Sequence, residues 1–450
     1  MNQRADLKPT RTLCLAACLL SCLGACSTYV SLPLDKNANG AASVEQLQHA
    51  ASLPETLGVE DIALLALRNN PALLAARAQH GVAQAQLRAA GILPNPSLGA
   101  SYAFLLGGPG SAGALTVSVT QDIRSLVLIS NRRAAARESA ASVDAAVVWQ
   151  EWQTLAKARL LAIDAIEGNR QITVLREGVK LLSDRLQRSR RSLADGDTTL
   201  AAEVPDLIAA TDLRRQLDDL ERQQESRRRE LAAFLGLAPE APLALSAQVE
   251  LPPLDAEAVR QSLAELADRR PDLVALQLGY RAEEERLRGA ILSQFPLFSL
   301  GATGGRDTSN VRSLGPQITL DLPIFDRNQG NIAIEGATRQ QMHDEFTARL
   351  LAARSEALAL LADQSALLDA YHGRLAQLNA LDAAAAGADE ALRAGNLDER
   401  GWVDLVSARN AKKLEIVSLE QNLLDQQTVI ALLVGAGMPP VSPNPSGVTP

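Results

Sequence analysis

Few side chains in this sequence are of the types that catalyse reactions or bind metal ions. The 450 residues include four cysteines and four dispersed histidines, which are His49, His80, His343 and His372. The sequence lacks the His-x-x-x-His and Cys-x-x-Cys spacings that bring two metal ligands together. We therefore predict no catalytic site, no metal site and no cofactor, and we expect that the chain is not an enzyme.

The cysteines indicate a different chemistry, because all four precede residue 27, at Cys14, Cys18, Cys22 and Cys26. Three basic residues and then the apolar run Leu13–Leu23 predict a secretory signal peptide over residues 1–25. That run is too short to span a bilayer. Leu23-Gly24-Ala25-Cys26 resembles the bacterial lipobox, which implies cleavage before Cys26 and lipidation of that cysteine. Ser27 follows, as in lipoproteins that are sorted to the outer membrane.

The bulk composition favours long helices and excludes some partners. Hydrophobic residues make up 47% of the chain but aromatic residues only 3%, so alanine and leucine supply most of the apolar surface. The net charge of −8 gives no electrostatic footprint for nucleic acid. The mature chain also lacks an uninterrupted apolar stretch of the length that a transmembrane helix needs.

An internal repeat organises the rest of the sequence. Asn70-Pro71-Ala72-Leu73 corresponds to Arg270-Pro271-Asp272-Leu273, and further matched segments follow in the same order at nearly the same offset. We therefore divide the chain into a lipidated linker (26–58), a first structural repeat (59–236), a linker (237–255), a second repeat (256–437) and a flexible Pro-rich tail (438–450).

Each repeat is predicted to contain a helix, a β-hairpin and a long pair of helices. In the first repeat, a helix from about Val59 to Ala90 should end before Pro94 and Pro96. Period-two patterns then predict strands at about 97–106 and 114–123, and at about 297–304 and 314–323 in the second repeat, where we place the turn near Gly304-Gly305. Each strand has one apolar face and one face of small or polar residues.

Long proline-free stretches follow both hairpins. One helix is expected from about Ser130 to Leu193, and at 1.5 Å per residue it would be roughly 95 Å long. Apolar residues at alternating three- and four-residue steps predict coiled-coil seams with polar interruptions. The first seam contains Ile172, Leu175, Val179, Leu182, Leu186, Ser189 and Leu193, and the second contains Ala353, Ala357, Leu360, Gln364, Leu367, Tyr371, Arg374 and Leu378. The helices should turn back at Gly196 and Gly395, which makes each pair antiparallel.

The strand pattern suits a membrane barrel, although a half-buried surface sheet has the same period. One chain supplies only four strands, and open strand edges in lipid would leave backbone groups unpaired. Two copies would give an eight-stranded barrel that side chains nearly fill, whereas three would give twelve strands and leave a pore. Small residues such as Gly99, Ser101 and Ser118 fit an open passage, so we favour a homotrimer.

With this plan, the whole mature chain resembles the TolC family of outer-membrane efflux proteins. Leu93-Pro94-Asn95-Pro96-Ser97-Leu98 resembles the start of the family's first strand. The run from Leu322 to Asn331 (LPIFDRNQGN) resembles the end of its last strand, most closely in the heavy-metal (cobalt–zinc–cadmium) branch. The resemblance implies a mainly α fold with a small β part, in which a shared twelve-stranded trimeric β-barrel continues into a periplasmic α-helical tunnel. The implied partners are outer-membrane lipids, a periplasmic adaptor protein and an inner-membrane pump of the resistance-nodulation-division type.

The resemblance also implies a periplasmic gate, meaning a constriction of the tunnel near the helical turns. The segment Trp402–Ala408 resembles the part that carries the family's gating aspartates. Asp404 takes the place of the first aspartate, whereas Ser407 replaces the second. Arg400 is placed to pair with a carboxylate on another helix. The alternative is that Asp404 lies on a solvated helix face.

Other functions remain open at this stage. A structural lipoprotein that bridges envelope layers without a pore would explain the lipobox and the helices but not four amphipathic strands. A soluble periplasmic enzyme is weakened by the missing site. For an exit duct, the residues do not separate export of heavy metals from export of drugs or proteins.

Overall fold

A computed structural model of the chain describes residues 29–37, 39–48, 54–250, 255–296, 298–436 and 438. The chain divides into two units, residues 1–39 and residues 40–450. The described residues of the first unit form neither helix nor strand. The predicted signal peptide, Cys26 and almost all of the tail 438–450 lie outside the described residues.

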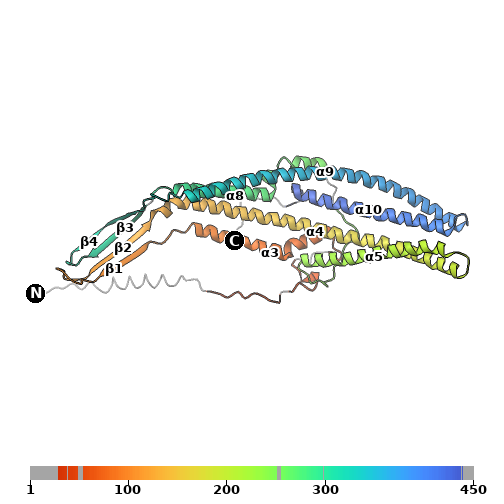
Figure 1. The fold of residues 1–450 in the computed structure, drawn as a ribbon, viewed down its shortest axis with the longest axis horizontal. Coiled ribbons are helices and arrows are strands. Elements are labelled where there is room, and N and C mark those ends of the chain that lie inside the picture. Colours follow the sequence, from red (N-terminus) through yellow and green to blue (C-terminus); the bar gives the residue numbers. More distant parts are fainter. Residues whose placement is uncertain are drawn as a thin grey trace. The chain divides into compact units, whose positions relative to one another are not determined.

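The second unit carries the duplicated plan of helix, hairpin and long helix pair (Figure 1). After a short 3-10 turn, η1 (Val44–Gln46), the first repeat consists of α2 (Val59–Asn69), α3 (Pro71–Ala90), β1 (Ser97–Ala103), β2 (Ala114–Asp122), α4 (Ile123–Ala194) and α5 (Leu200–Phe234). The second repeat consists of α6 (Ala256–Ser262), α7 (Leu266–Arg269), α8 (Pro271–Leu292), β3 (Phe298–Arg306), β4 (Arg312–Leu320), α9 (Gln329–Arg393) and α10 (Glu399–Val434).

Two helix boundaries differ from the sequence-based expectation. The single helix expected from Val59 to Ala90 is broken at Asn70, because Pro71 has no amide hydrogen and opens a new helix, α3. The Asn70 side chain caps α3 by accepting a hydrogen bond from the Leu73 amide at 2.9 Å. α4 begins at Ile123 rather than near Ser130, since the Asp122 carboxylate caps it directly after β2.

The four strands form one antiparallel sheet in the order β1-β2-β3-β4. The expected turn at Gly304-Gly305 is wrong: β3 continues to Arg306, and the chain reverses over residues 307–311. Cross-strand register puts the large apolar side chains of all strands on one face, which we call the apolar face. Its members include Leu98, Tyr102, Leu115, Val117, Val119, Phe298, Leu300, Leu314, Ile318 and Leu320.

The opposite face of the sheet, which we call the small face, carries only small or polar residues over most of its width. Its members include Gly99, Ser101, Thr116, Ser118, Gly301, Thr303, Ser313, Gly315, Gln317 and Thr319. The period-two prediction of two contrasting faces is therefore confirmed. β1 and β4 are the edge strands, each paired on one side only.

The helices bury two corresponding cores, one in each repeat. The first joins α2, the middle of α4 and the end of α5 around Ile62, Ile163 and Leu231, and the second joins α6, α7, α8, α9 and α10 around Leu266, Leu273 and Ile430. Figure 1 shows the antiparallel pairs α4–α5 and α9–α10. Of the two predicted seams, Ile172, Leu175 and Val179 in the first and Ala353, Ala357 and Gln364 in the second are buried. The other residues of both seams are half-buried.

Candidate functional site

The helix-hairpin ends carry the residues that the sequence assigns to a gate. α4 turns into α5 at Gly196, and α9 turns into α10 near Gly395; both glycines have positive φ, +83° and +72°, a conformation that other residues adopt at a cost. Asp404 and Arg400 lie in the first two turns of α10. The side chain of Asp404 is 65% exposed.

A buried aspartate on α5, Asp206, lies at the centre of this end of the molecule. Its carboxylate accepts hydrogen bonds from Arg185 Nη2 at 2.8 Å, from Arg400 Nη2 at 3.4 Å and from the Ser189 hydroxyl. Burial alone would raise the pKa of Asp206, but the hydrogen bonds from Ser189 and Arg185 outweigh it and lower the pKa. Asp206 is therefore held as an anion between two arginines.

Arg185 of α4 joins this aspartate to the predicted gate residue. Its Nη1 donates to Asp404 Oδ1 at 2.5 Å while its Nη2 binds Asp206, and its side chain is only 13% exposed. Burial opposes its charge, but the two carboxylates raise its pKa overall. The four groups, Arg185, Arg400, Asp206 and Asp404, balance in formal charge. They link α4, α5 and α10, so this end of the molecule is bound together across both helix pairs.

Sequence reasoning singled out only half of this network. Arg185 and Asp206 belong to the first repeat, and no spacing in the sequence connects them with residues 400–404. One signal was present: Ser189 is a polar interruption of the first seam, and it is the residue whose hydroxyl binds Asp206. A polar residue in an apolar seam indicates a buried polar partner on the facing helix.

The other acidic residues near the turns have local structural roles. Asp398 caps α10 by accepting a hydrogen bond from the Gly401 amide at 3.0 Å, and Glu399 forms an ion pair with Arg188 of α4. Asp195 is the C-terminal cap of α4. Asp404 is thus the acidic side chain of α10 that lies most directly on the Arg185–Asp206 cluster.

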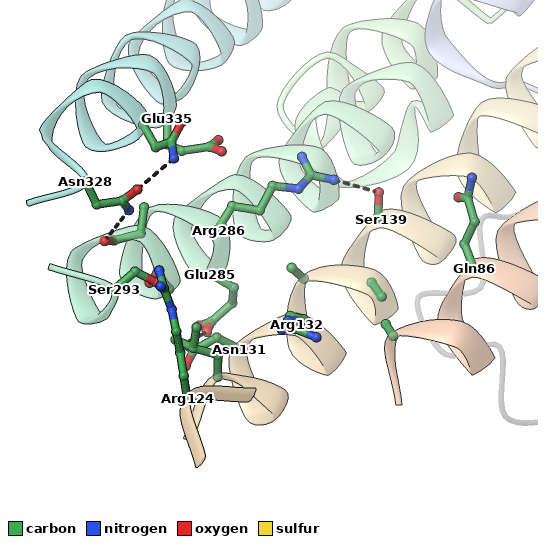
Figure 2. Close-up of a pocket in the computed structure, with 17 residues that line it drawn as sticks. Gln86, Arg124, Asn131, Arg132, Ser139, Glu285, Arg286, Ser293, Asn328 and Glu335 are labelled. Atoms are coloured by element: carbon green, nitrogen blue, oxygen red, sulfur yellow. Dashed lines mark hydrogen bonds between the residues drawn. The ribbon is translucent and has the colours of Figure 1, made fainter. Parts of the chain in front are cut away.

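A second polar region lies where the helices meet the sheet. A cavity of about 590 Å³ opens between α4, α8 and the start of α9, and Figure 2 shows Arg286 reaching across it to Ser139. Glu335 lines the cavity, and its hydrogen bond with the buried Glu283, together with burial, raises its pKa to about 7. The negative charge of Glu283 adds to this increase in the pKa of Glu335, and Arg286 opposes it.

A third group of carboxyls lies midway along the helices. Glu167 of α4 is completely buried and is bound by Arg170 at 2.6 Å. Nearby, burial first and then the charge of Asp164 raise the pKa of Asp425 on α10 to about 7, and Arg227 opposes the increase. In the part of the chain that the structure describes, no three histidine, cysteine or acidic side chains are placed to hold a metal ion.

The histidines take part in surface contacts. His80 lies 2.6 Å from Asp144, His343 lies 3.1 Å from Asp344, and the His372 ring contacts Tyr371. His49 is outside the described residues.

Among the helices of the described residues, none has the length and apolar character needed to cross a membrane.

Solved structures of outer-membrane proteins are similar to this chain over most of its length. The outer-membrane channel CmeC of Campylobacter jejuni superposes with a TM-score of 0.69 at 12% identity, over 92% of this chain and 95% of its own. The open-state MtrE outer-membrane channel of Neisseria gonorrhoeae superposes with a TM-score of 0.68 at 15% identity, over 92% of this chain and 99% of its own. The outer-membrane protein VceC of Vibrio cholerae superposes with a TM-score of 0.67 at 18% identity, over 89% of this chain and 100% of its own.

The chain has the fold of these outer-membrane channels. The likeness spans both helix pairs and the sheet, since it covers about nine-tenths of the chain. No protein-family model and no curated protein sequence matches this chain. The assignment of the channel fold therefore rests on structural similarity and not on sequence similarity. The roles of individual residues are argued from the contacts that they make in this chain.

Proposed function

We propose that the chain forms the outer-membrane exit duct of a tripartite efflux assembly, by which solutes leave the periplasm for the exterior. The observation that carries this proposal is the four-stranded sheet, which has one apolar face and one small face and is joined directly to very long helices. A sheet of this kind meets lipid on one side and water on the other. The channel fold supports the same function.

The open edges of the sheet lead to a homotrimer. β1 and β4 each leave one row of amides and carbonyls unpaired, and every unpaired group in lipid costs several kcal/mol. If β4 of one copy pairs with β1 of the next, three copies close a twelve-stranded barrel. Because the small face then lines the inside, the passage stays open.

The gate that we propose lies at the opposite end, at the helical turns in the periplasm. Asp404 and Arg400, together with Arg185 and Asp206, hold α4, α5 and α10 together there. Opening would require these ion pairs to exchange or break. Once that exchange releases Asp404 from Arg185, three copies of this exposed carboxylate around the axis would attract cations to the constriction.

Anchoring and partners complete the proposal. Cys26 would carry the lipid that tethers the linker to the outer membrane, and the adaptor and the resistance-nodulation-division pump would meet the helical end. The protein would conduct and would not catalyse. The cargo would be small solutes, and heavy-metal cations are the candidate that the run Leu322–Asn331 suggests.

That run has a structural role that does not depend on the cargo. It carries the chain from β4 to α9, and Asn328 takes the left-handed conformation at φ +63° just before the helix. The Asn328 side-chain amide binds the carbonyl of Ala290 on α8 at 2.8 Å, and Asp326 accepts from the Asn328 amide. The motif therefore fixes the joint between sheet and helices.

Two neighbouring residues on β2 test the assignment of the faces. Val117 lies on the apolar face beside Ala100 and Gly304, and Ser118 lies on the small face beside Gly99 and Thr303, so both positions have room for a longer side chain. An arginine that faces lipid near the bilayer centre costs about 2–4 kcal/mol, whereas one that faces the lumen costs far less. Val117→Arg should therefore impair insertion into vesicles, and Ser118→Arg should insert normally but conduct less.

The mass of the protein in detergent gives the oligomeric state. We expect three times the mass of one mature chain for the wild type and for Ser118→Arg. A stable monomer in detergent and in vesicles would contradict the shared barrel. Equal insertion of the two arginine variants would contradict the assignment of the faces.

A further inference from the structure

Two arginines lie directly opposite each other at the end of the sheet that is remote from the helices (Figure 1). Arg306 is the last residue of β3 and Arg312 is the first of β4, and they are cross-strand partners. On its other side Arg306 pairs with Leu115, which in turn pairs with Tyr102. Both arginines therefore belong to the apolar face, in a row with a leucine and a tyrosine.

These arginines have no anionic partner in the part of the chain that the structure describes. Neither forms an ion pair there, and the Arg306 Nε atom is enclosed without a hydrogen-bond partner. The nearest carboxylate in the sequence, Asp307, already accepts hydrogen bonds from the Ser309 and Val311 amides at 2.9 Å each, which holds the turn.

The rest of the sheet contributes no compensating charge. The four strands contain one acidic residue, Asp122, which lies at the helix end of β2 and caps α4. The loop of residues 104–113 between β1 and β2 contains no acidic residue. In a closed barrel, β4 would lie beside β1 of the next copy, and Ser97–Ala103 contains none either.

Like charges directly opposite each other destabilise a strand pair unless an anion lies between them. Opposed residues have Cβ atoms about 5 Å apart, a separation at which two planar guanidinium groups can bind one phosphate together. Arginine is suited to this role because its rigid fork of donors matches phosphate oxygens. The geometry thus describes an anion site whose partner comes from outside the chain.

We propose that Arg306 and Arg312 bind the phosphate of an anionic lipid headgroup in the outer leaflet of the outer membrane. This inference rests on the proposed function, which turns the apolar face toward lipid and the hairpin turns toward the exterior. The arginines then lie at the outer margin of the apolar band, at the level of the headgroups. Tyr102, in the same row, lies where interfacial aromatic residues are enriched. A trimer would carry three such sites.

The test is to count lipids that remain on the protein. Wild-type protein is placed in phosphatidylcholine nanodiscs that contain a small fraction of lipid A, which carries two phosphate groups, and is released for native mass spectrometry. Each arginine near a charged lipid surface contributes about a fivefold change in binding. Arg306→Gln/Arg312→Gln should therefore retain about 25-fold less lipid A, while Arg306→Lys/Arg312→Lys should retain an intermediate amount.

The matched control is Arg214→Gln/Arg215→Gln, which removes the same charge from exposed i,i+4 ion pairs on α5. It should retain as much lipid A as the wild type. Inorganic phosphate and lipid A without its phosphates are the remaining probes. The proposal expects that neither displaces phosphorylated lipid A; displacement by inorganic phosphate at millimolar concentration would overturn the lipid assignment in favour of a free anion.

The same spectra report the trimer, so a variant that fails to assemble is recognised directly, and the lysine variant then carries the comparison. The first adverse result is equal retention of lipid A by the glutamine variant, the control and the wild type, while the wild-type protein conducts in phosphatidylcholine bilayers. That result would overturn the arginine site and leave the proposed duct intact. Failure of the wild-type protein to insert into those bilayers would overturn both the site and the proposed duct.

Discussion

Asp425 offers a direct test of how buried charge limits the stability of the long helices. It lies on α10, where burial and the neighbouring charges of Asp164 and Glu167 outweigh the attraction of Arg227. Its pKa is consequently raised from 3.8 to about 7. The folded protein therefore binds a proton at Asp425 over a pH range in which the unfolded chain has already lost it.

The sign and size of the effect follow from proton linkage. Between about pH 4 and pH 7 the folded state binds more protons, so the free energy of unfolding falls as the pH rises through this range. A shift of about three units corresponds to about 4 kcal/mol. Because the side chain is only partly buried, solvent screening should reduce this to about 2 kcal/mol.

The variant Asp425→Asn removes the ionisable group and keeps the size of the side chain. We expect it to match the wild type at about pH 4 and to be more stable by about 2 kcal/mol at about pH 8, which is a few degrees in the midpoint temperature. Thermal unfolding followed by far-ultraviolet circular dichroism measures this difference. The control is Asp369→Asn, which changes an exposed aspartate on α9 and should have no effect at either pH. A destabilised Asp425→Asn at pH 8 would refute the reasoning, because it would show that the ionised carboxyl is stabilising.

Three further predictions concern the gate and the anchor. Asp404→Ala should raise single-channel conductance or weaken block by multivalent cations without reducing the amount of trimer, and unchanged values would remove Asp404 from the gate. Asp206→Asn should lower the free energy of unfolding by about 3 kcal/mol in denaturant titrations, because the positive charge of the buried Arg185 then loses most of its compensating negative charge. The matched control Asp404→Asn changes an exposed carboxylate and should lower the free energy of unfolding by less than about 1 kcal/mol. Cys26→Ser should abolish incorporation of radiolabelled palmitate and slow delivery to the outer membrane, and continued labelling would contradict the lipobox assignment.

Much of the fold was predictable because the duplication repeats its signals. Gly196 and Gly395 both follow the end of a long helix, α4 and α9, and take the left-handed conformation as the helical turns require. Alternating strand residues predicted the two faces of the sheet because a strand places successive side chains on opposite sides. These are local rules, and a linear pattern expresses them directly.

The boundaries of helices and strands that were predicted wrongly depend on competition between neighbouring elements. Asp122 caps α4 immediately after β2, so no loop separates strand from helix and the start of the helix has no distinct signal. β3 runs through Gly304 and Gly305 because hydrogen bonding with β2 and β4 holds these glycines in extended backbone. Tertiary pairing here overrides the preference of glycine for turns.

The network at the helical turns was only half predictable, for a geometric reason. Arg185, Asp206 and Arg400 meet because three helices pack side by side, and the register of that packing is not encoded in any one of them. The resemblance to a family led to α10 alone. The buried Asp206, which binds both arginines, required the structure.

Single-channel recording from the purified wild-type protein in planar bilayers tests the central claim most directly. If three copies close a twelve-stranded barrel lined by the small face, the protein should insert and produce discrete conductance steps, and Ser118→Arg should make each step smaller. Absence of any conductance from protein shown by mass to be an inserted trimer would contradict the account.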